Sequence, residues 1–280
     1  MEGYRPESLE ELQRLLGELP EGAAFVAGGT DWVIRERKAA QWPPALVSLG
    51  SLPELRQVER QDGGLLVGAG CTMTQLEEEP LLSGPWRAVA EAASQVGSTQ
   101  IRNRGTIGGN IANASPAADL AAPLVCLQGE ARLLGPAGVR SIPVEELLLG
   151  AEQTALPERT VITGFFLPEL EPGTVSHYHK QGFRRQLSIA RFGVCLALKL
   201  SGDQVERARV AVGAIGPKAV RLPELEEVLV GRRLSGELGR EAGAWLGGYI
   251  RRTSGRKYKA WASPGVMEDA LGMFGPDGDL

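Results

Sequence analysis

The stretch STQIRNRGTIGGNIANASP, residues 98–116, is the most informative part of this 280-residue chain. It is dense in Gly, Asn, Ser and Thr, and it follows RAVAEAASQV (87–96), whose alanine content predicts a helix. A segment of this composition turns rather than running straight. Inside it, Thr106-Ile107-Gly108-Gly109-Asn110 sets two adjacent glycines between side chains that donate hydrogen bonds. A ligand-binding loop is one interpretation of this segment.

A second glycine pair lies near the N-terminus, in FVAGGTDW (25–32), where a short apolar run meets a turn. Glycine adopts backbone angles closed to other residues and has no side chain to hold a ligand away. At both loops we expect consecutive backbone N–H groups to face a concavity that suits phosphate oxygens, with side-chain donors from Thr30, Thr106 and Asn110. Two ordinary tight turns are the alternative, and the residues leave both interpretations open.

The usual nucleotide-binding motifs are absent from the sequence. There is no GxxxxGK(S/T) run, and Gly68-Ala69-Gly70 is followed by Met73 where a Rossmann fingerprint has its third glycine. The loops by themselves therefore predict an anion or nucleotide pocket and nothing more specific.

The remaining pattern predicts an α+β fold. Ser8 and Glu11 suggest a capping box at the start of a leucine-rich helix over 9–19. Strands are expected at 23–29, 45–50, 65–70, 131–135, 138–143, 159–168, 188–200 and 206–216, and further helices at 119–127, 222–231 and 236–250. EPGTVS (171–176) breaks the pattern, which predicts two domains, 1–170 and 175–280.

Composition narrows the class of protein. The content of 43% hydrophobic and 23% charged residues is typical of a soluble globular protein, and a net charge of −4 gives no overall attraction to nucleic acid or to an anionic membrane. No run of 18 apolar residues occurs, and the polar, acidic N-terminus does not resemble a signal peptide, so we expect a cytoplasmic protein without a membrane span. The three cysteines, Cys71, Cys126 and Cys195, are far apart, and we expect them to be buried and not to hold a metal.

Taken together, the two glycine loops, IRNRGTIGGNIANASPAADLAAPL (101–124), SIPVEELLLG (141–150) and HYHKQGFRR (177–185) resemble the FAD subunits of the xanthine dehydrogenases. Carbon monoxide dehydrogenase flavoproteins and related molybdenum hydroxylases share the pattern. The resemblance covers nearly the whole chain, including AIGPKAVRLPELEEVLVG (214–231). It implies an N-terminal FAD-binding domain of the vanillyl-alcohol-oxidase-like, PCMH type, made of two subdomains, and a smaller C-terminal α+β domain.

The resemblance also implies which residues bind FAD. The diphosphate loop corresponds to Phe25, Val26, Ala27, Gly28, Gly29, Thr30, Asp31 and Trp32, and the second loop to Thr106, Ile107, Gly108, Gly109 and Asn110. Asp119 matches an acidic residue that hydrogen-bonds FAD, Ile162 falls on a strand position whose backbone meets the cofactor, and Lys180 matches a lysine near the flavin. Without the resemblance, Asp119 is better explained as a carboxylate at a helix N-terminus and Lys180 as an exposed strand lysine.

Two positions depart from the family pattern. Val96 stands where some relatives carry an aromatic residue near the flavin, and Ser188 stands where many carry an aspartate. Both departures leave the electron acceptor open and do not affect the expectation of FAD binding.

The resemblance implies that electrons released at a molybdenum cofactor pass through two 2Fe–2S clusters, both on partner subunits, to FAD on this chain and then to NAD or another acceptor. Xanthine or another purine is the first substrate expected, with carbon monoxide, nicotinate and aldehyde dehydrogenases as alternatives. No catalytic residue is assigned to this chain. A self-sufficient flavin oxidase of the same fold and a scaffold that has lost its cofactor are rival interpretations.

The basic stretch Arg251–Lys259 has three interpretations. A solvated surface loop is preferred, docking to an acidic partner subunit comes second, and nucleic-acid binding is third, because the rest of the chain is acidic.

Overall fold

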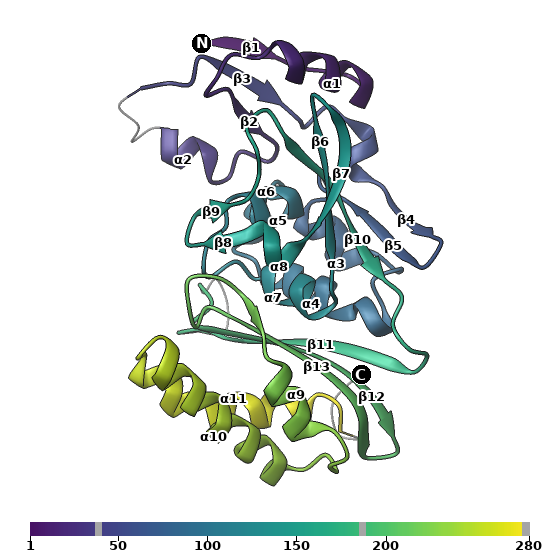
Figure 1. Cartoon of the computed structure of the whole chain (residues 1–280), viewed down its shortest axis with the longest axis vertical. Helices are drawn as coiled ribbons and strands as arrows, with labels where there is room; N and C mark the ends of the chain where they lie inside the picture. Colours follow the sequence, from purple (N-terminus) through teal and green to yellow (C-terminus); the bar gives the residue numbers. More distant parts are fainter. Residues whose placement is uncertain (37–40, 185–188, 276–280) are drawn as a thin grey trace.

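Sheets of three, five and four strands follow one another along the long axis of the molecule (Figure 1), a computed structural model that describes residues 1–36, 41–184 and 189–275. The first sheet is parallel, with the order β1-β3-β2, and α1 lies against it. Its elements are β1 (Glu2–Tyr4), α1 (Leu9–Glu18), β2 (Ala24–Val26), α2 (Trp32–Glu36) and β3 (Ala45–Ser48).

The predicted start of α1 is confirmed, with one difference in its cap. Ser8 Oγ accepts a hydrogen bond from the Glu11 N–H at 3.1 Å, as an N-cap should. The Glu11 carboxylate, however, accepts from the N–H of Glu7 at 2.7 Å rather than from Ser8, so the reciprocal half of the box is displaced by one residue.

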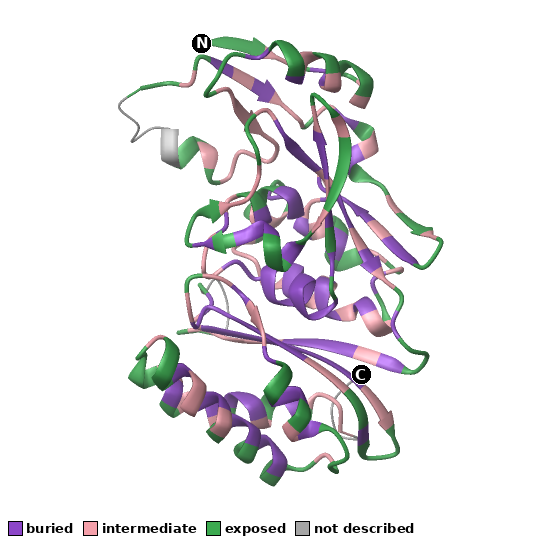
Figure 2. Cartoon of the chain, in the orientation of Figure 1, coloured by how far each residue is buried: buried purple, intermediate pink, exposed green. Residues whose placement is uncertain are grey.

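The middle sheet is antiparallel, with the order β4-β5-β10-β6-β7, and short helices and turns cover one side of it. Its strands are β4 (Val58–Gln61), β5 (Gly64–Gly68), β6 (Glu130–Gly135), β7 (Gly138–Pro143) and β10 (Val161–Pro168). The intervening elements are η1 (Pro53–Arg56), α3 (Met73–Glu78), η2 (Gly84–Trp86), α4 (Arg87–Ser94), α5 (Thr99–Arg102), α6 (Ile107–Ala112), α7 (Ala121–Cys126), α8 (Val144–Leu147), β8 (Leu148–Gly150) and β9 (Gln153–Thr154). Every residue of α7 is buried (Figure 2), and α7 lies on the side of this part of the chain that faces the third sheet (Figure 1).

The third sheet, β11-β12-β13-β14, is antiparallel and contributes to two hydrophobic cores. On β12, Cys195 and Ala197 belong to the core that contains α4 and α7, whereas Val194 and Leu196 belong to the core under the C-terminal helices. This alternation is the two-residue period of a strand buried on both faces. The elements are β11 (Thr174–Gln181), β12 (Phe192–Ser201), β13 (Gln204–Gly213), β14 (Val220–Arg221), α9 (Pro223–Leu229), α10 (Gly236–Thr253) and α11 (Lys257–Gly272).

The α+β class and the expected strands are confirmed, and the three cysteines are buried. Two expectations need correction. The segment 98–116 does turn, but it contains the short helices α5 and α6, and the basic stretch 251–259 forms the end of α10 and the start of α11 rather than a surface loop. Among the described residues, no helix combines the length and apolar character that crossing a bilayer requires.

Candidate functional site

The first glycine loop leaves β2 after Val26 and enters α2 at Trp32. Gly29 has φ +75°, in the left-handed region that favours glycine. The backbone N–H groups of Gly28, Gly29 and Thr30 donate no hydrogen bond to any described residue. All three residues line a cavity of about 380 Å³. Three consecutive unpaired N–H groups beside a cavity suit an anionic ligand, as was expected of this loop.

The two loops touch each other because Gly28 has no side chain. A Cβ atom on Gly28 would lie 1.9 Å from the carbonyl oxygen of Arg104, just before the second loop. A Cβ on Gly105 would lie 3.6 Å from Thr30 Oγ1. The glycine at position 28 is therefore required by the packing of one loop on the other, whatever ligand lies between them.

The second loop does not present a row of free N–H groups, which corrects the expectation for it. The N–H of Ile107 donates to Cys71 O at 3.0 Å and that of Gly108 to Ala69 O at 2.8 Å. The N–H of Gly109 donates to Thr106 Oγ1 at 3.1 Å, because Thr106 is the N-cap of α6. What this loop offers a ligand is the exposed backbone of Gly109, where an added Cβ would meet only Thr106 Oγ1, at 3.1 Å.

Two side chains in the same cavity carry buried polar atoms without a hydrogen-bond partner among the described residues. They are Trp32 Nε1, a donor, and Asn110 Oδ1, an acceptor. Buried polar atoms are nearly always paired in folded proteins, so an unpaired donor and an unpaired acceptor facing one cavity indicate a polar ligand. Val96 lines this cavity from the end of α4.

An apolar cleft of about 100 Å³ adjoins the loops on the side of the middle sheet. Ile162 on β10 lines it together with Leu55, Leu156 and Gly109. Because Gly109 also lines the larger cavity, one extended ligand can reach both. An apolar cleft beside an anion-binding loop suits a molecule with an aromatic ring and a phosphate group.

Asp119 and Lys180 form an ion pair, and neither residue lines the loop cavity. Lys180 Nζ is 2.9 Å from Asp119 Oδ2 and donates to Gln95 O at 2.9 Å, and Tyr178 OH donates to Asp119 Oδ1 at 2.9 Å. The Lys180 side chain is only 6% exposed, which excludes the interpretation of Lys180 as an exposed strand lysine. Burial raises the pKa of Asp119, and the Lys180 ammonium and Tyr178 hydroxyl offset this only in part.

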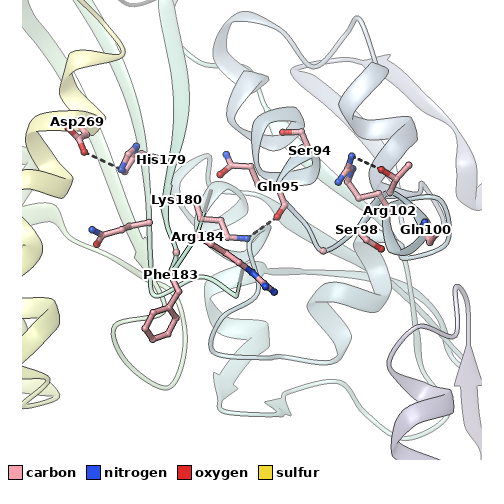
Figure 3. A pocket seen from close by; sticks show the side chains of 14 residues that line it. Ser94, Gln95, Ser98, Gln100, Arg102, His179, Lys180, Phe183, Arg184 and Asp269 are labelled. Carbon is pink, nitrogen blue, oxygen red and sulfur yellow. Dashed lines mark hydrogen bonds and ion pairs between the residues drawn. The ribbon is translucent and has the colours of Figure 1, made fainter. Parts of the chain in front are cut away.

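Lys180 and Gln95 also line a second cavity, of about 950 Å³, between the end of α4 and β11 (Figure 3), which we call the large cavity. The segment after α4 separates this cavity from the loop cavity, since Gln95 and Gly97 line the first and Val96 lines the second. Thus the loops, Val96 and Lys180 border adjacent hollows, whereas both Asp119 oxygens are occupied by protein groups.

Tyr178 and Gln95 were not predicted as site residues. Tyr178 is two positions before Lys180 on β11, so the strand period places both side chains on one face, and this pattern was readable in the sequence. Gln95 contributes a backbone carbonyl, which no side-chain pattern reveals. Ser188, the expected departure from the family pattern, lies outside the described residues.

Comparison with known proteins agrees with this geometry. The family described as FAD binding domain in molybdopterin dehydrogenase matches residues 1–170, and the family described as CO dehydrogenase flavoprotein C-terminal domain matches residues 177–256. The chain is 30% identical to the carbon monoxide dehydrogenase medium chain of Hydrogenophaga pseudoflava, over 84% of this chain and 82% of that protein. It is 32% identical to the nicotinate dehydrogenase FAD-subunit of Eubacterium barkeri, over 84% and 81%.

Further similarity comes from a putative xanthine dehydrogenase FAD-binding subunit of Escherichia coli, 29% identical over 80% of this chain and 77% of that protein. The solved structure of Hydrogenophaga pseudoflava carbon monoxide dehydrogenase lacking the Mo-pyranopterin moiety superposes with a TM-score of 0.87 at 28% identity, covering 97% of this chain and 96% of that chain. The chain therefore belongs to the family of FAD-binding medium subunits of molybdenum hydroxylases of the xanthine and carbon monoxide dehydrogenase type, and FAD is its cofactor.

Proposed function

We propose that this chain is the electron-transfer subunit of a molybdenum hydroxylase that oxidises xanthine or another purine. Electrons reach its FAD from a partner subunit with two 2Fe–2S clusters, which takes them from a molybdenum-cofactor subunit, and leave to NAD or another acceptor. The observation that supports FAD binding is the loop cavity, which is lined by Gly28, Gly29 and Thr30, whose N–H groups have no acceptor among the described residues, and by the bare backbone of Gly109.

In this proposal the residues 25–32 and 106–110 hold the diphosphate, with Trp32 Nε1 and Asn110 Oδ1 as further polar contacts. The apolar cleft at Ile162 receives one aromatic ring, and the loop cavity at Val96, next to the large cavity at Lys180, receives the other. The donor set fits FAD, because its phosphates need donors while its rings need apolar walls.

Bound FAD supplies the redox chemistry, since it accepts and releases electrons. The chain positions the cofactor and holds charged groups beside it. Asp119 and the Gln95 carbonyl hold the Lys180 ammonium at a fixed point on the wall of the large cavity. The ammonium is a fixed hydrogen-bond donor toward negative charge that develops nearby, and the paired Asp119 carboxylate offsets most of its field, so we expect a small rise in the reduction potential of the bound flavin.

The purine assignment rests on the Escherichia coli relative named as a putative xanthine dehydrogenase FAD-binding subunit. A carbon monoxide dehydrogenase subunit is the second candidate, favoured by the TM-score of 0.87. The substrate assignments are distinguished by assaying the assembled complex with xanthine, caffeine, nicotinate, glyceraldehyde and carbon monoxide. Turnover of carbon monoxide without turnover of xanthine would replace the purine proposal and leave the FAD proposal intact.

Gly109→Val tests the loop assignment. The added side chain meets only Thr106 Oγ1 in the protein and otherwise fills the ligand cavity, so we expect loss of at least about 90% of bound FAD with the fold retained. Gly28→Val is a poorer test because it collides with Arg104 O. Gly265→Val, on α11 in open space, is the matched control. Normal FAD content in a folded Gly109→Val protein would show that the loop does not bind the cofactor.

A further inference from the structure

The Asp119–Lys180 pair has a third member, the hydroxyl of Tyr178 on β11. Tyr178 OH donates to Asp119 Oδ1 at 2.9 Å, and Lys180 Nζ donates to Asp119 Oδ2 at 2.9 Å. Lys180 lines the large cavity (Figure 3), whereas Tyr178 and Asp119 line neither that cavity nor the loop cavity. The tyrosine hydroxyl can therefore act on a ligand in these cavities only through Asp119 and Lys180.

The tyrosine ring fits at this place because Gly193 on β12 has no side chain. Gly193 is the residue that pairs with Lys180 across the two strands. A Cβ atom on Gly193 would lie 2.6 Å from Tyr178 OH and 3.1 Å from Tyr178 Cε2, which is too close for atoms that are not bonded. The ring thus takes the space of the missing side chain, and its hydroxyl lies beside Asp119.

The backbone of Tyr178 is held by contacts that do not involve its hydroxyl. Glu91 Oε2 on α4 accepts from the Tyr178 N–H at 2.7 Å, and Ser176 Oγ on β11 accepts from the Ala88 N–H of α4 at 3.0 Å. Both contacts join β11 to α4. Loss of the hydroxyl alone should therefore leave the strand and the aromatic ring in place.

The hydroxyl of Tyr178 favours the charged form of Asp119. Burial raises the pKa of Asp119, and the ammonium of Lys180 and the hydroxyl of Tyr178 both lower it. A hydrogen bond to a carboxylate is stronger than one to a protonated acid, so the carboxyl should take up a proton more readily when the hydroxyl is removed. A protonated Asp119 no longer offsets the charge of the Lys180 ammonium.

The other titratable groups around Tyr178 do not compete with this effect. Burial raises the pKa of Tyr178 and of Cys195 on β12 well above their ordinary values, so both stay protonated over the range in which a carboxyl titrates. Glu91 on α4 contacts the Tyr178 N–H and His177 Nδ1, not the hydroxyl. These groups are the same in all the variants proposed below.

We propose that Tyr178 is a positioning residue, whose hydroxyl holds Asp119 against Lys180 and thereby controls the charge that this pair presents to the bound flavin. The inference rests on the proposed function, which takes one ring of FAD to lie in the loop cavity at Val96, next to Lys180 in the large cavity. Gly193 is the second residue of the device, since it makes room for the ring.

Tyr178→Phe removes the hydroxyl and keeps the ring. The test measures the reduction potential of FAD bound to the full chain as a function of pH. The variant and the unaltered chain should agree at high pH, where Asp119 is charged in both. As the pH falls, Asp119 of the variant should take up its proton first. The ratio of reduced to oxidised flavin at a fixed applied potential should then be about threefold or more higher in the variant, because the Lys180 charge is no longer offset.

Gly193→Ala tests the same hydroxyl by displacing it, and we expect a potential difference with the same dependence on pH. Two matched controls should follow the unaltered chain at every pH. Tyr249→Phe removes a hydroxyl from a partly buried tyrosine of α10. Gly213→Ala adds a methyl group on β13 opposite Gly193, where the nearest atom is Ala122 Cβ at an ordinary 3.6 Å.

Unfolding of the FAD-free chain by denaturant gives a second measurement that does not need the cofactor. The loss of stability in Tyr178→Phe should grow as the pH rises, because the missing hydrogen bond stabilises the carboxylate more than the protonated acid. Relative to the unaltered chain, the ratio of folded to unfolded protein should fall about fivefold or more further once Asp119 has lost its proton.

A pH-dependent potential difference in Tyr178→Phe and Gly193→Ala supports the positioning role. Potentials equal to those of the unaltered chain at every pH overturn it, and so does a difference that is constant with pH, because a purely structural tyrosine would change only stability or FAD content. If an altered chain does not retain FAD, an unfolding cost that is independent of pH overturns the role instead. Absence of FAD from the unaltered chain would refute the proposed function, so the two failures are distinguishable.

Discussion

At the scale of single residues, Asp119 and Lys180 were both assigned to the cofactor, and in the structure they form a buried ion pair with each other. Each lies beside a group of opposite charge, with Lys180 Nζ 2.9 Å from Asp119 Oδ2, and the cost of burying one charge depends on the other. Removing the Asp119 carboxylate and removing the Lys180 ammonium should nevertheless lower the stability of the chain by different amounts. Burial already raises the pKa of Asp119, so this carboxyl takes up a proton readily once Lys180 is gone, whereas a lysine without its counter-charge stays costly to bury.

We therefore expect Asp119→Asn to destabilise the chain by about 3 kcal/mol and Lys180→Met by less, with the double variant losing less than the sum. Denaturant unfolding at pH 7 measures all three. In Lys180→Met the carboxyl binds protons more tightly in the folded chain than in the unfolded one, so stability should fall as pH rises above the ordinary pKa of an aspartate. Additive losses without this pH dependence would contradict a coupled pair.

Lys259 provides a second prediction at this scale. Burial, with Arg256 and Arg191 nearby, lowers its pKa to about 8, and its ammonium donates to Ala214 O. Between that pKa and the ordinary value for lysine, the unfolded chain binds more protons than the folded chain, so stability rises with pH over this interval. Relative to Lys259→Met, the unaltered chain should gain at most about 1 kcal/mol between pH 7 and pH 10, because partial exposure screens the charge. A constant difference between the two proteins would argue against a buried ammonium.

At the scale of elements, the contact between α10 and α11 depends on glycines. Gly239, Gly243 and Gly247 are four residues apart, so they share one face of α10. A Cβ on Gly243 would lie 2.3 Å from Pro264 Cα, and a Cβ on Gly247 would lie 2.5 Å from Ala260 O. The bare glycine face brings the two helices into backbone contact.

Gly243→Ala should therefore force the helices apart and lower stability by about 1–3 kcal/mol. Gly248→Ala is the matched control on the same helix, where the nearest atom is the end of the Arg252 side chain at 3.4 Å. It should raise stability by about 0.5–1 kcal/mol, because alanine favours the helix. Thermal unfolding compares the two, and equal effects of the two substitutions would mean that the close contact does not constrain the helices.

The elements also show where sequence patterns stopped being informative. The strands β12 and β13 were predicted because Val and Leu runs flank the turn at Gly202, and α1 because Ser8 and its leucines mark a helix start. The helix α11 was not predicted, since its sequence carries Pro264 inside and shows almost no segregation of apolar residues. Its packing face is created by the glycines of α10, a tertiary feature that local periodicity does not report.

The site was predictable to a similar degree. Both glycine loops were predicted as candidate anion sites, and the N–H groups of Gly28, Gly29 and Thr30 in the first have no acceptor in the part of the chain that the structure describes. The N–H groups of the second loop are paired, because Thr106, Ala69 and Cys71 accept those hydrogen bonds, and two of these acceptors are distant backbone carbonyls. The partners of Lys180 were missed for the same reason, as Gln95 and Asp119 approach it only through the fold.

At the scale of the whole molecule, the third sheet connects the cofactor half to the C-terminal helices. Glu91 on α4 accepts from the Tyr178 N–H at 2.7 Å and lies 2.9 Å from His177 Nδ1, which ties α4 to β11. The other face of the sheet packs on α9, α10 and α11. The loops that hold the diphosphate in the proposed function, at α2 and α6, lie on the other side of the third sheet from these helices (Figure 1).

Removing FAD should therefore loosen the molecule unevenly. With free FAD at 100 times its dissociation constant, binding should stabilise the folded chain by about 2.7 kcal/mol. Amide hydrogen exchange should quicken without FAD at the β2–α2 loop and at α6, and much less in α10 and α11, whose core is separate from the loop cavity. Reconstitution with FAD should restore slow exchange in the same segments. The Gly109→Val protein should exchange like the FAD-free chain whether or not FAD is added. If exchange instead changed equally in α10 and α11, the cofactor would be acting through the third sheet, and the two halves would have to be treated as one cooperative unit.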